Sequence, residues 1–424
     1  MGVEQIVSIA VFVGVMVLIV TEKVHRTLAA LLGAAVILVS GILPFDAAMN
    51  HIDFNTLGVL VGMMLFVAVV RRSGLFEYIA IKAAKLAKGD PWLIMVALTI
   101  VTAVLSAFLD NVTTVLLVGP MTLMICRELK LSPVPFFVTQ IMASNIGGTA
   151  TLIGDPPNIM IGSGAGLTFI DFITTDAPAI ILVLAATIIA FRFIYGRKLS
   201  AAEEDMWAIQ QLDERESIKD RTLFIKSIVM IVLVIVAFMI HSVFNLETAV
   251  IALSAAAIMM VIGRQDVEET VLGVEWTTIG FFAGLFIVVG GMVQTGVVNM
   301  LAQWLVSITE GQDLIAMLVI LLASAVISAI LDNIPFVATM IPVITTMAAS
   351  GVDVAPLWWA LSLGACLGGN GTLIGASANV VLSGISNREG YKMTFVGYLK
   401  VGLPLMLMSI VISGVYLVFR FGLE

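Results

Sequence analysis

The chain is a succession of long apolar stretches separated by short polar connections. Eight uninterrupted stretches fall near residues 3–20, 27–43, 54–70, 178–196, 223–243, 247–262, 276–292 and 397–419. Most approach the roughly 20 residues that an α-helix needs to cross the hydrocarbon core of a bilayer. The pattern therefore predicts an all-α integral membrane protein.

Four further apolar stretches carry polar breaks. Residues 92–126 and 313–349 each hold an Asp-Asn pair near the middle, and residues 134–167 and 356–384 each hold a glycine-rich break. About 35 residues are too many for one crossing but suit two half-depth helices that meet at a tip. We expect 92–126 and 313–349 to be re-entrant hairpins, and 134–167 and 356–384 to be broken spanning helices.

The two halves of the chain repeat each other. The pairs Asp110-Asn111 and Asp332-Asn333 lie 222 positions apart (332 − 110), and Pro120 and Pro342 lie in the same register. Each unit has five spans and one hairpin, and an odd number of crossings forces opposite orientations in the membrane. We therefore predict two inverted-topology repeats, residues 1–196 and 223–424, with ten spans in all and a linker at 197–222.

Composition and charge placement agree with a membrane location. The chain is 60% hydrophobic and 12% charged, against about 25% charged residues in soluble domains. Basic residues gather near 23–26, 71–88, 127–130 and 192–198, whereas the connections 44–53, 168–178, 241–247 and 351–356 have none. The preference of Lys and Arg for cytoplasmic loops predicts a multi-pass protein of the cell (inner) membrane with a cytoplasmic linker and both termini outside.

The acids at the two expected hairpin tips are the first candidates for function. A carboxylate at the bilayer centre costs several kcal/mol unless it is paired or solvated, so Asp110 and Asp332 are expected to exchange a proton or coordinate a cation such as sodium. Asn111 and Asn333 add amide groups beside them. Thr113 and Thr114 add hydroxyls in the first copy only. The structural alternative is that each Asp caps the second hairpin helix, and the two roles can coexist.

The glycine-rich breaks supply the second candidate set. Glycines let the backbone leave the helix, and the freed N–H and C=O groups attract anions and cations. Asp155 is a third carboxylate, and the second copy has only Ala376-Ser377-Ala378 opposite Asp155-Pro156-Pro157. The remaining candidates are Asn145, Gly148, Thr149, Thr151, Asn158, Gly369, Asn370, Thr372, Ser377 and Asn379. A plain helix kink is the structural alternative.

No Arg or Lys lies in either break or either tip. A fixed cationic clamp for a multiply charged substrate is therefore not expected, which favours a cation, a proton or a small inorganic solute that bears oxygen. No nucleotide-binding loop, catalytic triad or metal-ligand spacing is present, so we expect neither an enzyme nor a cofactor, and no nucleic-acid partner. Energy would come from a proton or sodium gradient or from a separate cytoplasmic ATPase subunit. The two cysteines, Cys126 and Cys366, cannot build a multi-thiol site.

Three motifs resemble the ion-transporter superfamily: residues 109–116, 153–158 and 368–379. Within it, they are most similar to the branch of arsenite permeases and the melanosomal P protein, with sodium–proton antiporters of the NhaD type and dicarboxylate transporters further away. The resemblance implies a scaffold and a transport domain, a homodimer, and an elevator-like motion. The tips of dicarboxylate relatives carry Ser-Asn-Thr where this chain has Asp-Asn, which argues against a dicarboxylate substrate.

The resulting hypothesis is an arsenite/antimonite efflux permease driven by proton or sodium exchange. Arsenous acid is mostly neutral near pH 7 and presents hydroxyl groups, so amides and backbone groups would suit it while the carboxylates take the coupling ion. The alternatives are a sodium–proton antiporter that uses Asp110 and Asp332 directly, or a transporter of another small anion. A channel is disfavoured because two occluding hairpins suit alternating access.

Overall fold

The predicted all-helical fold is confirmed by the computed structural model, which describes residues 2–21, 23–197, 199–309 and 312–422, none of them in a strand. The elements of the first half are α1 (Val3–Thr21), α2 (Arg26–Val39), α3 (Phe45–His51), α4 (Phe54–Arg71), α5 (Leu75–Leu86), α6 (Pro91–Ser106), α7 (Asn111–Glu128), α8 (Val134–Thr149), α9 (Pro156–Ala165), α10 (Phe169–Phe191) and η1 (Arg192–Gly196). Those of the linker are α11 (Glu203–Gln211) and η2 (Glu214–Ser217). Those of the second half are α12 (Arg221–Ile240), η3 (His241–Phe244), α13 (Thr248–Gly263), α14 (Val267–Leu272), α15 (Trp276–Gln294), α16 (Val297–Ile308), α17 (Asp313–Ile330), α18 (Asn333–Ala349), α19 (Ala355–Gly368), η4 (Gly369–Gly371), α20 (Ser377–Arg388) and α21 (Phe395–Phe421).

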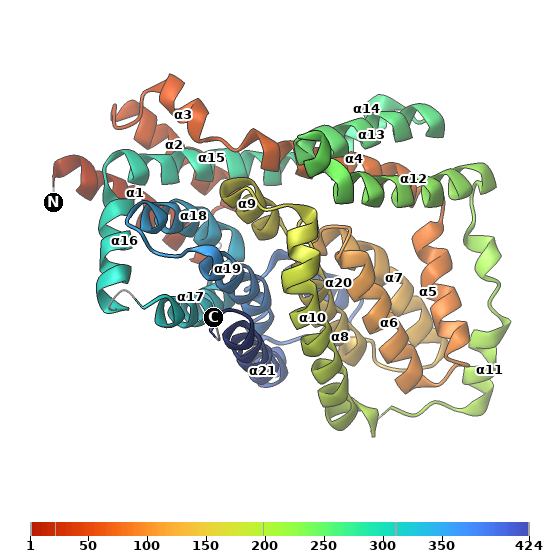
Figure 1. The fold of residues 1–424 in the computed structure, drawn as a ribbon. Coiled ribbons are helices and arrows are strands. Elements are labelled where there is room, and N and C mark those ends of the chain that lie inside the picture. Colours follow the sequence, from red (N-terminus) through yellow and green to blue (C-terminus); the bar gives the residue numbers. More distant parts are fainter. Residues whose placement is uncertain (1, 22, 198, 310–311, 423–424) are drawn as a thin grey trace.

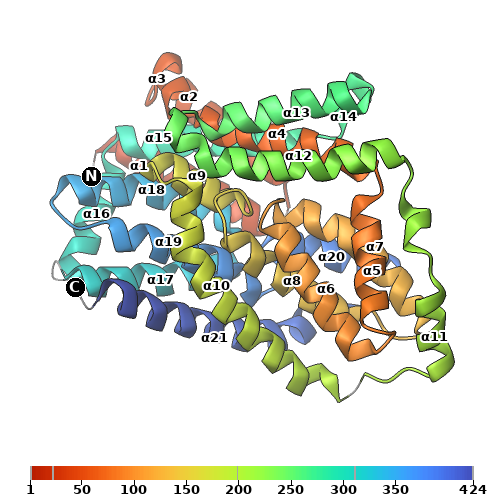
Figure 2. The same ribbon diagram turned by 45° about the vertical axis from the view of Figure 1, so that its right-hand side comes forward.

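The two halves have the same order of elements in the same register. The helices α4 and α15, α5 and α16, and α7 and α18 all begin 222 residues apart (276 − 54, 297 − 75 and 333 − 111). The amphipathic helices α5 and α16 lie at opposite ends of the molecule (Figures 1 and 2). Equivalent helices at opposite ends are what an inverted repeat requires.

The helices form two layers. The scaffold layer, residues 3–71 and 221–294, runs along the upper side of Figure 1, with α4 packed on α13 and α2 packed on α15. The site layer, residues 91–191 and 313–421, lies beneath it and contains both hairpins and both broken helices. The helices α5 and α16 connect the two layers at the two ends.

The site layer interlocks the two repeats. The second hairpin arm of each repeat packs against the second half of the other repeat's broken helix, so α7 contacts α20 and α18 contacts α9. Helix α6 packs closely on α8, and α17 on α19, because a glycine lies at each contact. A Cβ on Gly147 would overlap the backbone of Ala103, and one on Gly368 would overlap that of Ala325. Both hairpin tips and both breaks are thereby brought to the middle of the molecule.

Seven described helices are long and apolar enough to cross a membrane by length and composition: α1, α4, α10 with η1, α12 with η3, α15, α17 and α21. Six of them coincide with predicted spans, and α2 and α13 are shorter apolar helices of 14 and 16 residues at two further predicted spans. The remaining predicted spans are the broken helices.

Two segments differ from their sequence-based description. Residues 168–178 are not a connection: α10 begins at Phe169, with a reciprocal cap between Thr168 and Asp171, and Pro178 lies within the helix. The linker, predicted only as a cytoplasmic connection, forms α11 and η2 and is held to the rest of the protein by ion pairs. The Lys85 ammonium donates to Glu214 at 2.6 Å, and Lys130 pairs with Asp205 at 2.7 Å. The linker is therefore docked on α5 and on the connection that follows α7.

Candidate functional site

Each predicted tip acid begins a helix. Asp110 accepts a hydrogen bond from the backbone N–H of Thr113 at 2.9 Å and caps α7. Asp332 accepts from the N–H of Ile334 at 3.3 Å and caps α18. Capping uses one oxygen of each carboxylate, so each acid keeps an oxygen for another partner.

The two breaks are built alike. The amide Nδ2 of Asn158 donates to the carbonyls of Thr149 and Thr151, and that of Asn379 donates to the carbonyls of Gly369 and Thr372. The hydroxyl of Thr372 donates to the carbonyl of Ala329, and that of Thr151 donates to Ala107. These bonds satisfy the carbonyls that a broken helix leaves unpaired and tie each break to its own hairpin.

A buried amide network joins the two repeats at the centre. Asn111 donates to Asn145 at 3.2 Å and to Asp155 at 3.4 Å. Asn333 donates to the other oxygen of Asp155 at 3.3 Å. Asn145 then donates to Asn370 at 2.9 Å and to Asn379 at 3.0 Å. Asp155, 1% exposed, therefore receives one amide from each hairpin tip.

A small pocket lies where the tips and the scaffold layer meet. Its residues are Arg26, Leu60, Met64, Asp110, Asn111, Val112, Asp155, Pro156, Glu275, Thr278, Asp332, Asn333, Ile334 and Ser377. Its volume is about 20 Å³, which is room for about one water-sized species. The pocket thus has room for an ion or a water molecule between the tips and the scaffold layer.

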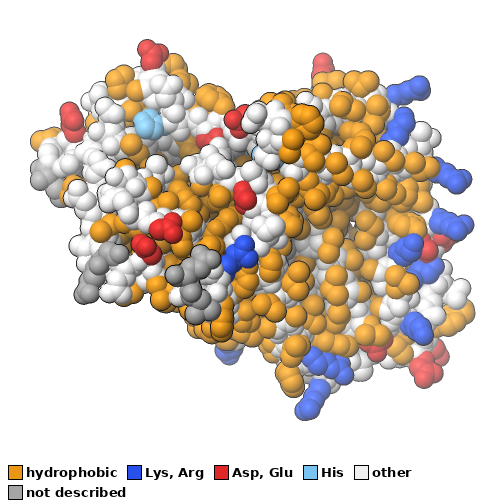
Figure 3. Space-filling view, in the orientation of Figure 1, with side chains coloured by type: hydrophobic (Ala, Val, Ile, Leu, Met, Phe, Trp, Pro, Cys, Tyr) orange, Lys and Arg blue, Asp and Glu red, His pale blue; other side chains and the backbone are white. Residues whose placement is uncertain are grey.

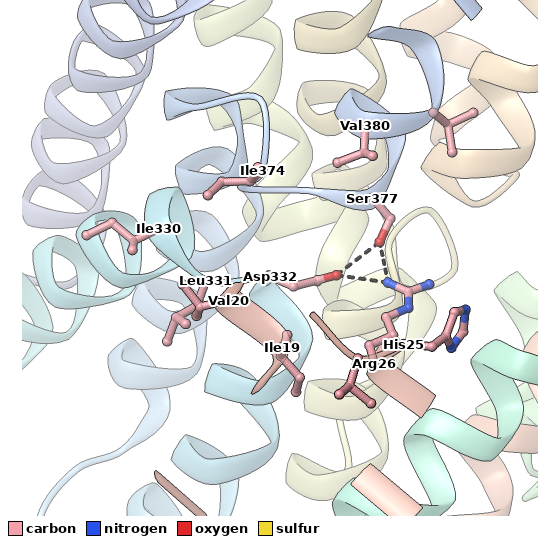
Figure 4. A pocket seen from close by; sticks show the side chains of 12 residues that line it. Ile19, Val20, His25, Arg26, Ile330, Leu331, Asp332, Ile374, Ser377 and Val380 are labelled. Atoms are coloured by element: carbon pink, nitrogen blue, oxygen red, sulfur yellow. Dashed lines mark hydrogen bonds and ion pairs between the residues drawn. The ribbon is translucent and has the colours of Figure 1, made fainter. Parts of the chain in front are cut away.

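A guanidinium enters this site from the scaffold layer, and the expectation that no cation lies near the tips was wrong. Arg26, at the start of α2, places Nη1 3.0 Å from Asp332 Oδ2 and 2.5 Å from Ser377 Oγ (Figure 4). Its Nη2 donates to Thr278 at 3.3 Å, and the group lies 5.3 Å from the ring centre of Phe281. This ion pair could not be predicted from local sequence patterns, because Arg26 and Asp332 are 306 residues apart.

Two larger cavities flank the pocket at corresponding places in the two repeats. One, of about 400 Å³, is lined by α4 residues, by Thr113 and Leu116 of α7, and by Glu275. The other, of about 270 Å³, is lined by α15 residues, by Ala338 and Ile341 of α18, and by Asp53. Glu275 also lines the central pocket, whereas Asp53 does not. The two flanking cavities are therefore not equivalent in their relation to the central pocket in this conformation.

The other predicted residues serve the surrounding framework. Thr113 contributes its backbone N–H to the Asp110 cap, and Thr114 is fully buried. Gly148 and Gly369 lie where the backbone on one side of each break approaches the backbone on the other side. A Cβ there would come within 2.7 and 3.1 Å of the carbonyl oxygens of Gly154 and Gly375. The residues Asn145, Thr149, Thr151, Asn158, Asn370, Thr372 and Asn379 are buried around the pocket without lining it.

Sequence reasoning missed four functional candidates besides Arg26. Asp53 and Glu275 differ by 222 positions (275 − 53), so the repeat register itself could have found them. Asp176 and Ser362, 2.5 Å apart, had no such signal, because Asp176 was assigned to a connection.

The charges around the pocket favour a cation. Four of the lining residues are acidic (Asp110, Asp155, Glu275 and Asp332) and one, Arg26, is basic. Among the described residues, no group of three or more His, Cys, Asp or Glu side chains has the arrangement of a metal site. Intramembrane carboxylates of this kind can bind a cation or a proton.

Comparison with known proteins identifies the class. The family model described as "Citrate transporter" (CitMHS) matches residues 16–364. The crystal structure of the Alcanivorax borkumensis YdaH transporter, reported to have an unusual topology, superposes with a TM-score of 0.65 at 16% identity and covers 90% of each chain. The fold is therefore that of a membrane transporter.

The particular family follows. The chain belongs to the citrate transporter (CitMHS) family. It is 43% identical to an uncharacterised transporter of Mycobacterium tuberculosis over 98% of this chain and 99% of the relative. It is also 34% identical to the P protein of Sus scrofa over 98% of this chain, which spans 60% of that protein. The resemblance to the P protein that the three motifs indicated is confirmed.

Proposed function

We propose that this protein is a secondary active transporter that couples a monovalent cation to the movement of a small oxygen-bearing solute. The observation that carries the proposal is the meeting of both tip acids, Asp155 and Glu275 around one small pocket. Intramembrane carboxylates that face a shared cavity mark ion pathways and proton relays. The coupling ion would be H⁺ or Na⁺.

For the solute, we propose arsenite, antimonite or a chemically similar small hydroxide. Arsenous acid carries no net charge near neutral pH and can exchange hydrogen bonds with the amides of Asn111 and Asn333, which lie in the pocket wall. Trivalent arsenic prefers soft sulfur ligands. Cys366, however, is fully buried, does not line the pocket, and points to Asn158 at 3.5 Å. Contacts through oxygen and nitrogen are therefore the basis of the proposal.

Citrate itself fits this site poorly, although the family model carries its name. A tricarboxylate would bring up to three negative charges to a pocket lined by four acids and one guanidinium. At an effective dielectric constant of 20, two like charges 4 Å apart repel by about 4 kcal/mol. The tips would have to be neutralised by several cations before such a substrate could enter.

The two layers support alternating access. Arg26 and Glu275 come from the scaffold layer, whereas Asp332 and Asp155 come from the site layer. A displacement of the site layer along the scaffold layer would break the Arg26–Asp332 pair and open the pocket toward one of the flanking cavities. We propose that the end carrying α5 and α11 is cytoplasmic, since Lys and Arg side chains gather at that edge (Figure 3), which matches the positive-inside rule.

A sodium–proton antiporter is the second candidate. The small volume of the pocket, about 20 Å³, favours it, because a bare ion would fill this space without any rearrangement. In that case the acids would bind the two ions alternately, and no further solute would be needed.

Flux measurements in proteoliposomes separate these functions. The proposal predicts arsenite uptake or release that speeds up with an imposed pH or sodium gradient and stops when the gradient is collapsed. Sodium flux driven by a pH gradient, with no arsenite flux, would establish the antiporter instead. Citrate accumulation without arsenite movement would contradict both candidates.

A further inference from the structure

A second buried carboxyl group lies outside the central pocket. Asp176, in α10, is 0% exposed, and its Oδ1 accepts no hydrogen bond from any residue that the structure describes. The second repeat has no equivalent acid. The caps Thr168 and Thr394 and the prolines Pro178 and Pro404 are each 226 residues apart (394 − 168 and 404 − 178), which places Gly402 opposite Asp176.

The hydroxyl of Ser362 contacts two oxygens, those of Asp176 and Asn158, but carries only one hydrogen. Ser362 Oγ lies 2.5 Å from Asp176 Oδ2 and 2.8 Å from Asn158 Oδ1. The orientation of the Asn158 amide is fixed, because its Nδ2 donates to the carbonyls of Thr149 and Thr151 at 3.1 and 3.0 Å. The Asn158 group that faces Ser362 is therefore an oxygen, which can only accept.

Hydrogen counting then gives the protonation state. A serine hydroxyl has one hydrogen and can accept further bonds, and an ionised carboxylate can only accept. Two short contacts to two acceptors need two hydrogens, and Ser362 supplies one. We propose that Asp176 is a proton-binding site of the transport mechanism and that it is protonated in this conformation, donating Oδ2–H to Ser362 Oγ while Ser362 donates to Asn158.

The surroundings suit a neutral acid. A distance of 2.5 Å between two oxygens accommodates a hydrogen but leaves no room for a metal ion between them. The charged and titratable groups around Asp176 are Arg420 and Tyr416 of α21 and Cys366 of α19. Cys366 also interacts with Asp155. Arg420 donates to the hydroxyl of Thr175 at 3.3 Å and forms no ion pair with Asp176 within the described part of the chain.

Loss of the Asp176 proton would change the hydrogen bonds of Asn158, which holds the glycine-rich break of the first repeat. When Asp176 releases its proton, the carboxylate becomes an acceptor, and the Ser362 hydrogen turns from Asn158 Oδ1 to Asp176 Oδ2. Asn158 then keeps only the weak contact from Cys366 Sγ at 3.5 Å on that oxygen. Since Asn158 holds the carbonyls of Thr149 and Thr151, the charge of Asp176 would alter how firmly the break is held beside Asp155.

Infrared spectroscopy tests the proton directly, and this test does not depend on the solute. The purified protein at pH 7 is expected to show a carboxylic-acid C=O stretching band that Asp176→Asn removes and that Asp353→Asn, at an exposed acid, leaves unchanged. Ser362→Ala should shift that band to higher frequency without removing it, because the hydrogen bond is lost. A parent spectrum unchanged by Asp176→Asn, or a band that appears only when sodium is omitted, would overturn the proposal.

The coupling role rests on the proposed function and is tested separately. In proteoliposomes, Asp176→Asn is expected to let arsenite equilibrate but to abolish its accumulation against a gradient when a pH difference is imposed. Accumulation equal to that of the parent would overturn the coupling role. If the parent itself moves no arsenite, the proposed solute is wrong, and the infrared result still decides whether Asp176 holds the proton.

Discussion

Arg26 and Asp332 form an ion pair across the two layers, with Nη1 and Oδ2 3.0 Å apart and side chains 25% and 12% exposed. The pair has no counterpart in the other repeat. The residue in register with Arg26 is Thr248 (26 + 222), and Asp110 forms no ion pair with a described residue. The two tips are therefore alike in backbone geometry but different in charge, and only the second is held to the scaffold layer by a guanidinium.

Removing Arg26 should destabilise this conformation through Asp332. Arg26→Ala leaves a largely buried carboxylate without its partner, at a cost of roughly 1–3 kcal/mol. In an Asp332→Asn background, the same substitution should cost much less, because no charge is left unpaired. Thermal unfolding of the four purified proteins measures this coupling. Equal losses of stability in both backgrounds would contradict a direct interaction.

Solute handling should depend on the amides and not on the thiol. Asn145→Ala removes donors to Asn370 and Asn379 and the acceptor for Asn111, each broken bond leaving a buried group at a cost of roughly 1–3 kcal/mol. We expect Asn145→Ala and Asn370→Ala to lose arsenite efflux. Cys366→Ser keeps the hydrogen bond to Asn158 and should keep most efflux.

Arsenite accumulation in cells that express each variant at equal membrane levels measures this difference. Loss of efflux with Cys366→Ser alone would mean that arsenic is held by sulfur, and it would overturn the contacts proposed above.

The linker contact should weaken in acid. The hydrogen bond from Lys85 lowers the pKa of Glu214 below its ordinary value of 4.5, so the folded state prefers the ionised carboxylate. The contribution to docking is therefore present above pH 4.5 and is lost as the pH falls through the lowered pKa. A spin label at Trp207→Cys, an exposed position in α11, should become more mobile on acidification, and at pH 7 in a Glu214→Gln variant. Glu203→Gln, at an exposed acid of the same helix, is the control and should change nothing at pH 7.

The proposed sidedness has a direct chemical test. The connection between α7 and α8 lies beside the linker, because Lys130 pairs with Asp205. Inversion places the equivalent connection between α18 and α19 at the opposite face. A label at Glu203→Cys should react only from the cytoplasm and one at Asp353→Cys only from outside. Reaction of both from the same side would contradict the proposed orientation.

The repeat and the hairpins could be predicted because they depend on local pattern. An Asp-Asn pair in the middle of an apolar run determines a helix cap and a chain reversal wherever the segment lies, and the shift of 222 residues recurs in the helix starts. Asp53 and Glu275 share that register. Arg26 could not be predicted, because no local rule links it to Asp332 across 306 positions. Asp176 was missed because Pro178 resembled a helix boundary, whereas α10 continues through it.

Ion-driven flux in charge-neutral variants tests most directly whether the tip acids couple an ion gradient to transport. Asp110→Asn and Asp332→Asn keep side-chain oxygens that can cap α7 and α18, so both proteins should remain folded. The measurement is arsenite flux driven by a pH or sodium gradient in proteoliposomes that contain the parent, each single variant or the double variant. We expect gradient-driven flux to be abolished in each single variant and in the double variant. Normal gradient-driven flux in both single variants would show that the acids are helix caps alone.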